Sequence, residues 1–250
     1  MLIAPIVLWA VLAFEPHLRR CYNMPDGMTM CTCASKLALY APGEVRNQTA
    51  NVRADVVTIE HSAKGLYEDA SQSAWDEASH QAATLANAVC ELESDTEGEQ
   101  SNLSELDTRT ARLMAEVPAR DQASTMEDSN EITRIMYEPG TKVDSTVPLT
   151  IDMLCYDDRK LQIGILRSDV SLLRRTVAEM RHSWAEARPA VRAVGKRKVF
   201  IRFDVVLRRL EHAKDLADYV PLVRVERSEA DKIESVFAGG ANKLPNREVR

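Results

Sequence analysis

The sequence predicts a mostly α-helical fold with a minor β component, an α+β protein whose first half consists of long amphipathic helices and whose second half combines a small sheet with helices. Three observations support this fold class. Glycine is scarce, with 9 residues in 250, and aromatic residues make up only 5%, so the core must be largely aliphatic and alanine. Apolar residues recur every three or four positions over most of the chain. After about residue 140, several short segments instead alternate with a period of two, which is typical of strands.

Pattern and composition divide the chain into four regions. Residues 1–50 form an irregular N-terminal segment with an apolar start. Residues 51–140 form an acidic helical region, and residues 141–240 form a basic α+β region. Residues 241–250 are expected to be a loose tail.

The acidic region is predicted to begin with one long amphipathic or coiled-coil-like face. Its apolar positions shift phase once, and this shift resembles a stutter. The positions are Val52, Val56, Ile59, Ala63, Leu66 and Ala70, then Trp75, Ala78, Ala82, Leu85, Val89 and Leu92. A second helix is expected from Asn102 to the proline at 118, and a weaker one over 129–137.

The basic region is predicted to contain several strands. Alternating apolar residues over 147–153 and 161–165 indicate a β-hairpin around the polar sequence CYDDRK, and Pro148 places its first strand at a sheet edge. Residues 199–203 indicate another strand, and 222–226 a short one. Helices are expected over 204–219 and 228–237.

The clearest helix follows Ser168 and ends at Pro189. Its apolar seam steps by three and four residues without a break: Val170, Leu173, Val177, Met180, Trp184 and Ala187. Four arginines spaced by seven residues flank this seam: Arg167, Arg174, Arg181 and Arg188. A seam with one basic flank is suited to packing against an acidic neighbour, and basic flanks also bind phosphates.

Charge is distributed unevenly along the chain. Residues 1–150 hold 11 Lys and Arg against 23 Asp and Glu, whereas residues 151–250 hold 21 against 15. The two halves are expected to complement each other inside one fold, for example through Glu91, Glu93, Asp95, Glu97 and Glu99. The alternative is that the basic half meets an acidic partner outside the chain.

The leading functional prediction is a non-enzymatic helical scaffold or interaction subunit of a larger assembly, with a protein partner or self-association. The alternative is nucleic-acid binding by residues 159–209, where 14 basic residues face only 4 acidic ones. The candidate contacts for either partner are Arg167, Arg174, Arg181, Arg188, Lys196, Arg197, Lys198 and Arg202. An enzyme with an unrecognised site is the third possibility, although no catalytic motif is present.

No cofactor, catalytic residue or metal ligand is predicted. The segment from Cys21 to Cys33 concentrates soft sulfur ligands, but it lacks the second close cysteine pair that structural zinc requires. The apolar stretch from Met1 to Phe14 is expected to pack as core or interface, while a signal peptide or a membrane contact stays open as an alternative. Five scattered cysteines weakly favour a reducing compartment.

Overall fold

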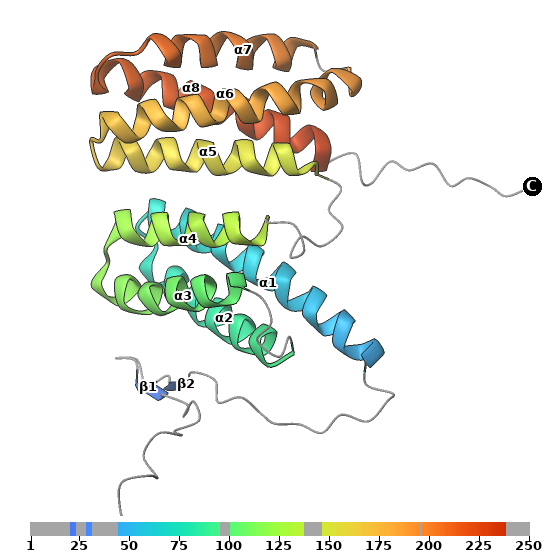
Figure 1. Cartoon of the computed structure of the whole chain (residues 1–250). Coiled ribbons are helices and arrows are strands. Elements are labelled where there is room, and N and C mark those ends of the chain that lie inside the picture. Colours follow the sequence, from blue (N-terminus) through green and yellow to red (C-terminus); the bar gives the residue numbers. More distant parts are fainter. Residues whose placement is uncertain are drawn as a thin grey trace, which may run out of the picture.

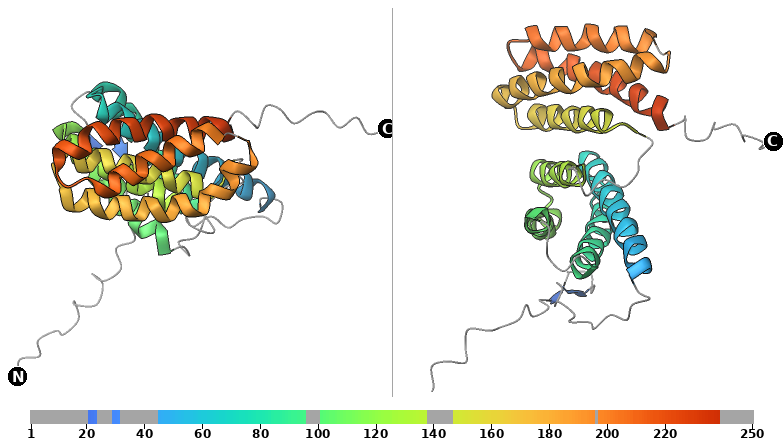
Figure 2. Two further views of the ribbon diagram at one scale, coloured as in Figure 1. Left: turned by 90° about the horizontal axis from the view of Figure 1, so that it is seen from above. Right: turned by 45° about the vertical axis from the view of Figure 1, so that its right-hand side comes forward.

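The computed structural model describes residues 21–23, 29–31, 45–95, 101–137, 147–195 and 197–238, and these residues contain eight α-helices. The helices form two four-helix bundles stacked on each other (Figures 1 and 2). The first bundle consists of α1 (Val45–Ser71), α2 (Trp75–Asp95), α3 (Ser101–Ala119) and α4 (Gln122–Met136). The second consists of α5 (Leu149–Leu166), α6 (Val170–Ala193), α7 (Arg197–His212) and α8 (Leu216–Ala238).

The predicted α+β fold class is wrong. The second half contains no sheet within its described residues, because every strand predicted there lies in a helix. The strands that the structure records are two short segments before the first bundle, β1 (Cys21–Asn23) and β2 (Thr29–Cys31), which pair antiparallel with Cys21 opposite Cys31. The helical body is therefore all-α.

The predicted hairpin over 147–165 is helix α5, and its burial explains the error. Residues 154–159 are buried without interruption, because α5 packs against the rest of its own bundle and also against the first bundle. A helix that is covered on nearly all sides has no polar face, so its sequence loses the 3.6-residue rhythm. Pro148, predicted at a sheet edge, instead precedes the first residue of α5 as its N-cap.

The other predicted strands belong to α7 and α8. Phe203, Val206, Leu207 and Leu210 of α7 are buried and follow helical spacing, whereas Ile201 is 47% exposed. β-branched and aromatic residues at 199–203 produced a local alternation that the longer helical pattern overrides. Pro189 and Pro221 lie inside helices α6 and α8 rather than ending them.

Three tight turns between helices share one geometry. Ser73, Arg120 and Ser168 each have a positive φ of 54–59° within two residues of the end of a helix. At each turn, the next residue donates its backbone N–H to the carbonyl five residues earlier, at 2.8–3.1 Å. This arrangement is the Schellman ending of a helix, here without its usual glycine. The phase shift near residue 72, predicted as a stutter in one helix, is therefore the turn between α1 and α2.

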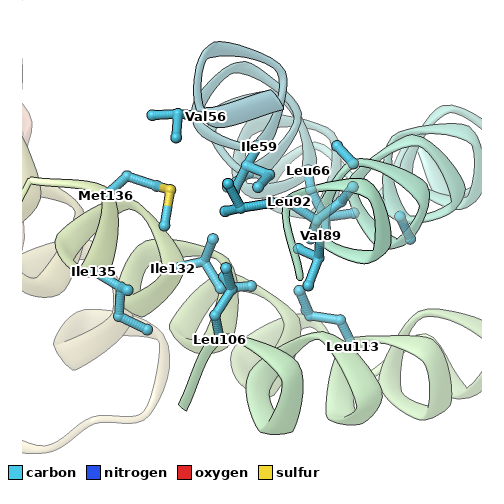
Figure 3. Packing of buried hydrophobic residues seen from close by; sticks show 14 of the residues in the cluster. Val56, Ile59, Leu66, Val89, Leu92, Leu106, Leu113, Ile132, Ile135 and Met136 are labelled. Atoms are coloured by element: carbon cyan, nitrogen blue, oxygen red, sulfur yellow. The ribbon is translucent and has the colours of Figure 1, made fainter. Parts of the chain in front are cut away.

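Each bundle has its own apolar core. In the first bundle, side chains from all four helices meet along the central axis, with Ile59, Leu106 and Ile132 almost fully buried (Figure 3). In the second, the predicted α6 seam is buried from Leu173 to Ala187, and Trp184 packs on Phe203 with ring centroids 4.6 Å apart. Short connections between antiparallel helices produce this up-and-down arrangement.

The joint between the bundles is largely polar. A small apolar cluster there brings Tyr67, Ala70 and Met126 of the first bundle against Ile163 of α5. Around it, the Tyr67 hydroxyl donates to the carbonyl of Arg159 at 3.1 Å. Such a mixture of small apolar and polar contacts resembles an interface between domains more than the inside of one.

The close approach of α5 and α6 gives a prediction about Gly164. A Cβ atom at this position would lie 2.8 Å from Cδ2 and 3.0 Å from Cγ of Leu173, which is fully buried. We expect Gly164→Ala to destabilise the protein by about 1 kcal/mol, because overpacking outweighs the gain in helix propensity. Leu173→Ala alone should cost about 2–5 kcal/mol.

The two substitutions should also be coupled. In the Leu173→Ala background the clash is absent, so Gly164→Ala should become neutral or stabilising. Urea unfolding of the four proteins in the cycle, followed by far-UV circular dichroism, measures the coupling. Additive effects would contradict the predicted contact.

Candidate functional site

Two of the eight predicted basic contact residues, Arg181 and Arg188, pair with an acid at the centre of the second bundle's ion-pair network. Asp204 of α7 is the centre of this network: its carboxylate lies 3.8 Å from Arg181, 3.5 Å from Arg188 and 3.3 Å from Arg208. Arg181 also pairs with Glu211 at 2.8 Å. These arginines of α6 therefore tie α6 to α7.

Two other arginines of the predicted set bind elsewhere inside the chain. Arg167 pairs with Glu127 of α4 at 2.5 Å, across the joint between the bundles. Arg174 donates to the carbonyl of Lys214 at 2.8 Å. Among the described residues, Arg167 is the one basic residue of 159–209 for which the structure shows an ion pair with the first bundle.

The remaining predicted contacts lie at the start of α7. Arg197 and Lys198 are exposed, and neither has an acidic partner within the described part of the chain. Arg202 comes only within 4.0 Å of Glu229. Lys196 lies outside the described residues, as do Glu97, Glu99 and the segment from Met1 to Phe14.

An aromatic side chain lies beside this basic turn. The ring of Phe200 is covered by two guanidinium groups, with Cζ of Arg192 4.6 Å and Cζ of Arg188 5.1 Å from the ring centroid. Both distances are typical of cation–π contacts. Since Phe200 also packs on Trp184, the turn between α6 and α7 is held by aromatic contacts.

An open groove lies between α7 and α8, and the sequence did not predict it. It has a volume of about 700 Å³ and is open to solvent along its length. Val205, Ala213, Ala217, Pro221 and Leu222 supply its apolar lining, and Arg208, Arg209, His212 and Asp218 supply its polar lining. We call this surface the α7–α8 groove.

The rim of the α7–α8 groove carries more positive than negative charge. Arg209 is exposed and has no acidic partner among the described residues. Arg208 is exposed and shares Asp204 with two other arginines. Asp218 accepts hydrogen bonds from the backbone of Lys214 at 3.0 Å, so its carboxylate is engaged in capping α8.

Buried carboxyl groups form a second unusual cluster, on α5 and α8. Burial raises the pKa of Asp157 to about 7 and the pKa of Asp158 to about 6. Burial and the negative charge of Asp158 hold the pKa of Glu226 well above its ordinary range, which favours the protonated form of Glu226 beside Asp158. Asp157 and Asp158 were predicted in the polar turn of a β-hairpin, but they lie within helix α5.

The histidines of the described bundles and the free thiol of Cys155 lie apart from one another. His61, His80, His182 and His212 are all exposed on separate helices. Within the described residues, no three His, Cys, Asp or Glu side chains come together as metal ligands, and no helix is long and apolar enough to cross a membrane. Burial raises the pKa of the Cys155 thiol, which makes it a poor nucleophile.

Comparison with known proteins adds no relative. No protein-family model matches the chain, and no curated protein or solved structure matches it significantly.

Proposed function

We propose that this protein is a non-enzymatic interaction subunit that holds an acidic amphipathic helix of a partner protein in the α7–α8 groove. The main observation that supports this proposal is the combination of an apolar floor with a cationic rim in the groove. An amphipathic helix binds such a groove by inserting its apolar face and placing its charges against the rim. Charge complementarity therefore favours an acidic partner helix.

The surface of α7 extends the groove. Ile201 is 47% exposed and Val205 is 36% exposed, one helical turn apart on the same face. Val220 of α8 is 37% exposed. Aliphatic side chains in water next to a hollow are typical of interaction sites.

The second candidate is nucleic-acid binding at the turn between α6 and α7. It is favoured by Arg197 and Lys198, which lack acidic partners within the described residues, and by the aromatic ring of Phe200 nearby. It is disfavoured by Asp204, whose carboxylate neutralises Arg181 and Arg188. This leaves few free charges to bind phosphates.

A reciprocal binding experiment separates the two functions. The probes are a fluorescent 21-residue helical peptide of Leu and Glu heptads, a scrambled peptide of the same composition, and a labelled single-stranded RNA. The variants are Arg208→Glu with Arg209→Glu in the groove, and Arg197→Glu with Lys198→Glu at the turn. Circular dichroism confirms that both variants are folded.

At about 0.15 M salt we expect the helical peptide to bind with micromolar affinity and the scrambled peptide to bind much more weakly. The groove variant should lose at least about tenfold in affinity, since two attractive charges become repulsive, while the turn variant keeps its affinity. Peptide binding that survives the groove substitutions would overturn the proposal. RNA binding that is steeply salt-dependent and lost in the turn variant would establish the second candidate instead.

A further inference from the structure

A buried guanidinium lies at the joint between the bundles without an ion-pair partner. Arg159 of α5 is 8% exposed, and none of its nitrogen atoms forms an ion pair with a described carboxylate. Its one hydrogen bond there is long, from Nη1 to Oγ1 of Thr133 at 3.5 Å. Burying a charge without a partner costs several kcal/mol, so such a residue requires an explanation.

Partial compensation comes from an aromatic ring and from the negative charges of Asp158 and Glu234, neither of which forms an ion pair with Arg159. The ring of Tyr67 lies 5.7 Å from Cζ of Arg159. Glu234 of α8 acts on Arg159 through its negative charge without touching it. Burial lowers the pKa of Arg159, but its neighbours raise it by more, so the group stays charged.

Two further donors interact electrostatically with Arg159. The hydroxyl of Tyr137, at the end of α4, is buried and has no hydrogen-bond partner. The ammonium of Lys64 on α1 lies 5.7 Å from the centre of the Tyr137 ring. Burial raises the pKa of Tyr137 to about 12; the positive charges of Lys64 and Arg159 oppose this rise, and the negative charges of Asp152 and Glu60 add to it.

The hydrogen-bond capacity of this cluster is unbalanced. Arg159 has five N–H donors and Lys64 has three, while the phenol of Tyr137 adds one. One of the Lys64 donors is used by Glu60 at 2.7 Å, and the hydroxyl of Thr133 already donates to the carbonyl of Asn130. The carboxylates of Glu60 and Asp152 act on this cluster, but the described hydrogen bonds use only a few of its N–H and O–H donors, and no carboxylate forms an ion pair with Arg159.

We propose that Arg159, Lys64 and Tyr137 form a binding site for a small oxyanion at the joint between the bundles. A carboxylate or phosphate group has the charge and the lone pairs that this set of donors lacks, and the planar fork of arginine matches either group. The side chain of Lys64 is 28% exposed, so the site reaches the surface at that residue. α1, α4 and α5 meet here, so a bound anion would link the two bundles.

The test is a titration of the full-length protein with inorganic phosphate and, separately, with acetate, at constant ionic strength and pH 7. Calorimetry measures binding, and thermal unfolding measures the rise in Tm that ligand binding to the folded state produces. We expect saturable binding of one anion with a Kd below about 1 mM. The preferred anion distinguishes a phosphate source from a carboxylate source.

Three variants make the result specific. Arg159→Met fills a similar volume without the charge, so it should fold at least as stably in anion-free buffer and lose the anion-dependent rise in Tm. Tyr137→Phe removes one hydroxyl and should weaken binding severalfold even if Arg159→Met does not fold. Arg175→Met, at an exposed position of α6, is the matched control and should bind like the wild type.

The proposal would be overturned if neither anion changed the Tm of the wild-type protein or produced a heat of binding. An equal response of the wild type, Arg159→Met and Tyr137→Phe would overturn it as well, because binding would then occur elsewhere.

Discussion

Replacement of Trp184 by alanine should lower the free energy of unfolding by about 3–5 kcal/mol. Trp184 is fully buried at the centre of the second bundle, with the rings of Phe203 and Phe200 4.6 Å and 5.4 Å away. Truncation would leave a cavity that these rings cannot fill, and it would also remove the indole N–H that donates to Asp204 at 3.4 Å.

Urea unfolding followed by far-UV circular dichroism measures this loss. Ile201→Ala is the matched control, because Ile201 is 47% exposed on the neighbouring helix and should change the free energy by less than about 0.5 kcal/mol. A loss below about 1 kcal/mol for Trp184→Ala would mean that the second core is not packed as described.

Raising the pH from 5 to 8 should destabilise the protein by on the order of 3 kcal/mol. Burial raises the pKa of Asp157 to about 7 and the pKa of Asp158 to about 6. Burial and the negative charge of Asp158 both raise the pKa of Glu226. In the unfolded chain the same groups lose their protons near pH 4. Between about pH 4 and the raised pKa values of the folded protein, the folded state binds more protons than the unfolded chain does. The free energy of unfolding therefore falls as the pH rises.

The groups around this carboxyl cluster explain why it cannot easily ionise. The positive charges of Arg227 and Arg159 lower the pKa of Asp158, whereas the negative charge of Asp231 on α8 raises this pKa. The side-chain amide of Gln162 also donates a hydrogen bond to the Asp158 carboxylate at 2.9 Å. The guanidinium of Arg227 is engaged by Glu68 of α1 at 2.9 Å. Complete ionisation would therefore bury more negative charge than the neighbouring cations can neutralise.

Thermal unfolding between pH 5 and pH 8 checks this dependence. Glu226→Gln should flatten it and raise the Tm at pH 8, because an amide donates to Asp158 without a titrating proton. Asp157→Asn should have a smaller effect of the same sign, since Ser183 still contacts it. A wild-type Tm that is constant over this range, or that rises with pH, would contradict the cluster.

Helices with one apolar and one polar face could be predicted from the sequence. The α6 seam is correct from Leu173 to Ala187, because only one side of this helix is buried and the spacing of apolar residues records that side. The core positions of α1 and α2 follow for the same reason, from Val56 to Leu92.

Helix α5 could not be predicted in this way, since both bundles cover it. Asp157, Asp158 and Arg159 are buried there, although three adjacent charges in a sequence are typical of a surface turn. The turns at Ser73 and Arg120 could not be predicted from the sequence either, because neither position holds the glycine that usually follows a helix in this conformation.

The candidate site was predicted only in part. The basic character of residues 159–209 was visible in the sequence, but which arginines stay free depends on Asp204, one acid that attracts three of them. The α7–α8 groove depends on two helices approaching across the turn at 213–215, and no local pattern encodes that approach.

The most direct test of the proposed function is to map the acidic helical peptide on the protein by NMR. Backbone amide signals of the deuterated chain are recorded as the peptide is added, with the scrambled peptide as control. We expect the largest shifts at residues that line the groove: Val205, Arg209, His212 and Ala217. Shifts concentrated on α1–α4 or around Arg197, or equal shifts with the scrambled peptide, would contradict it.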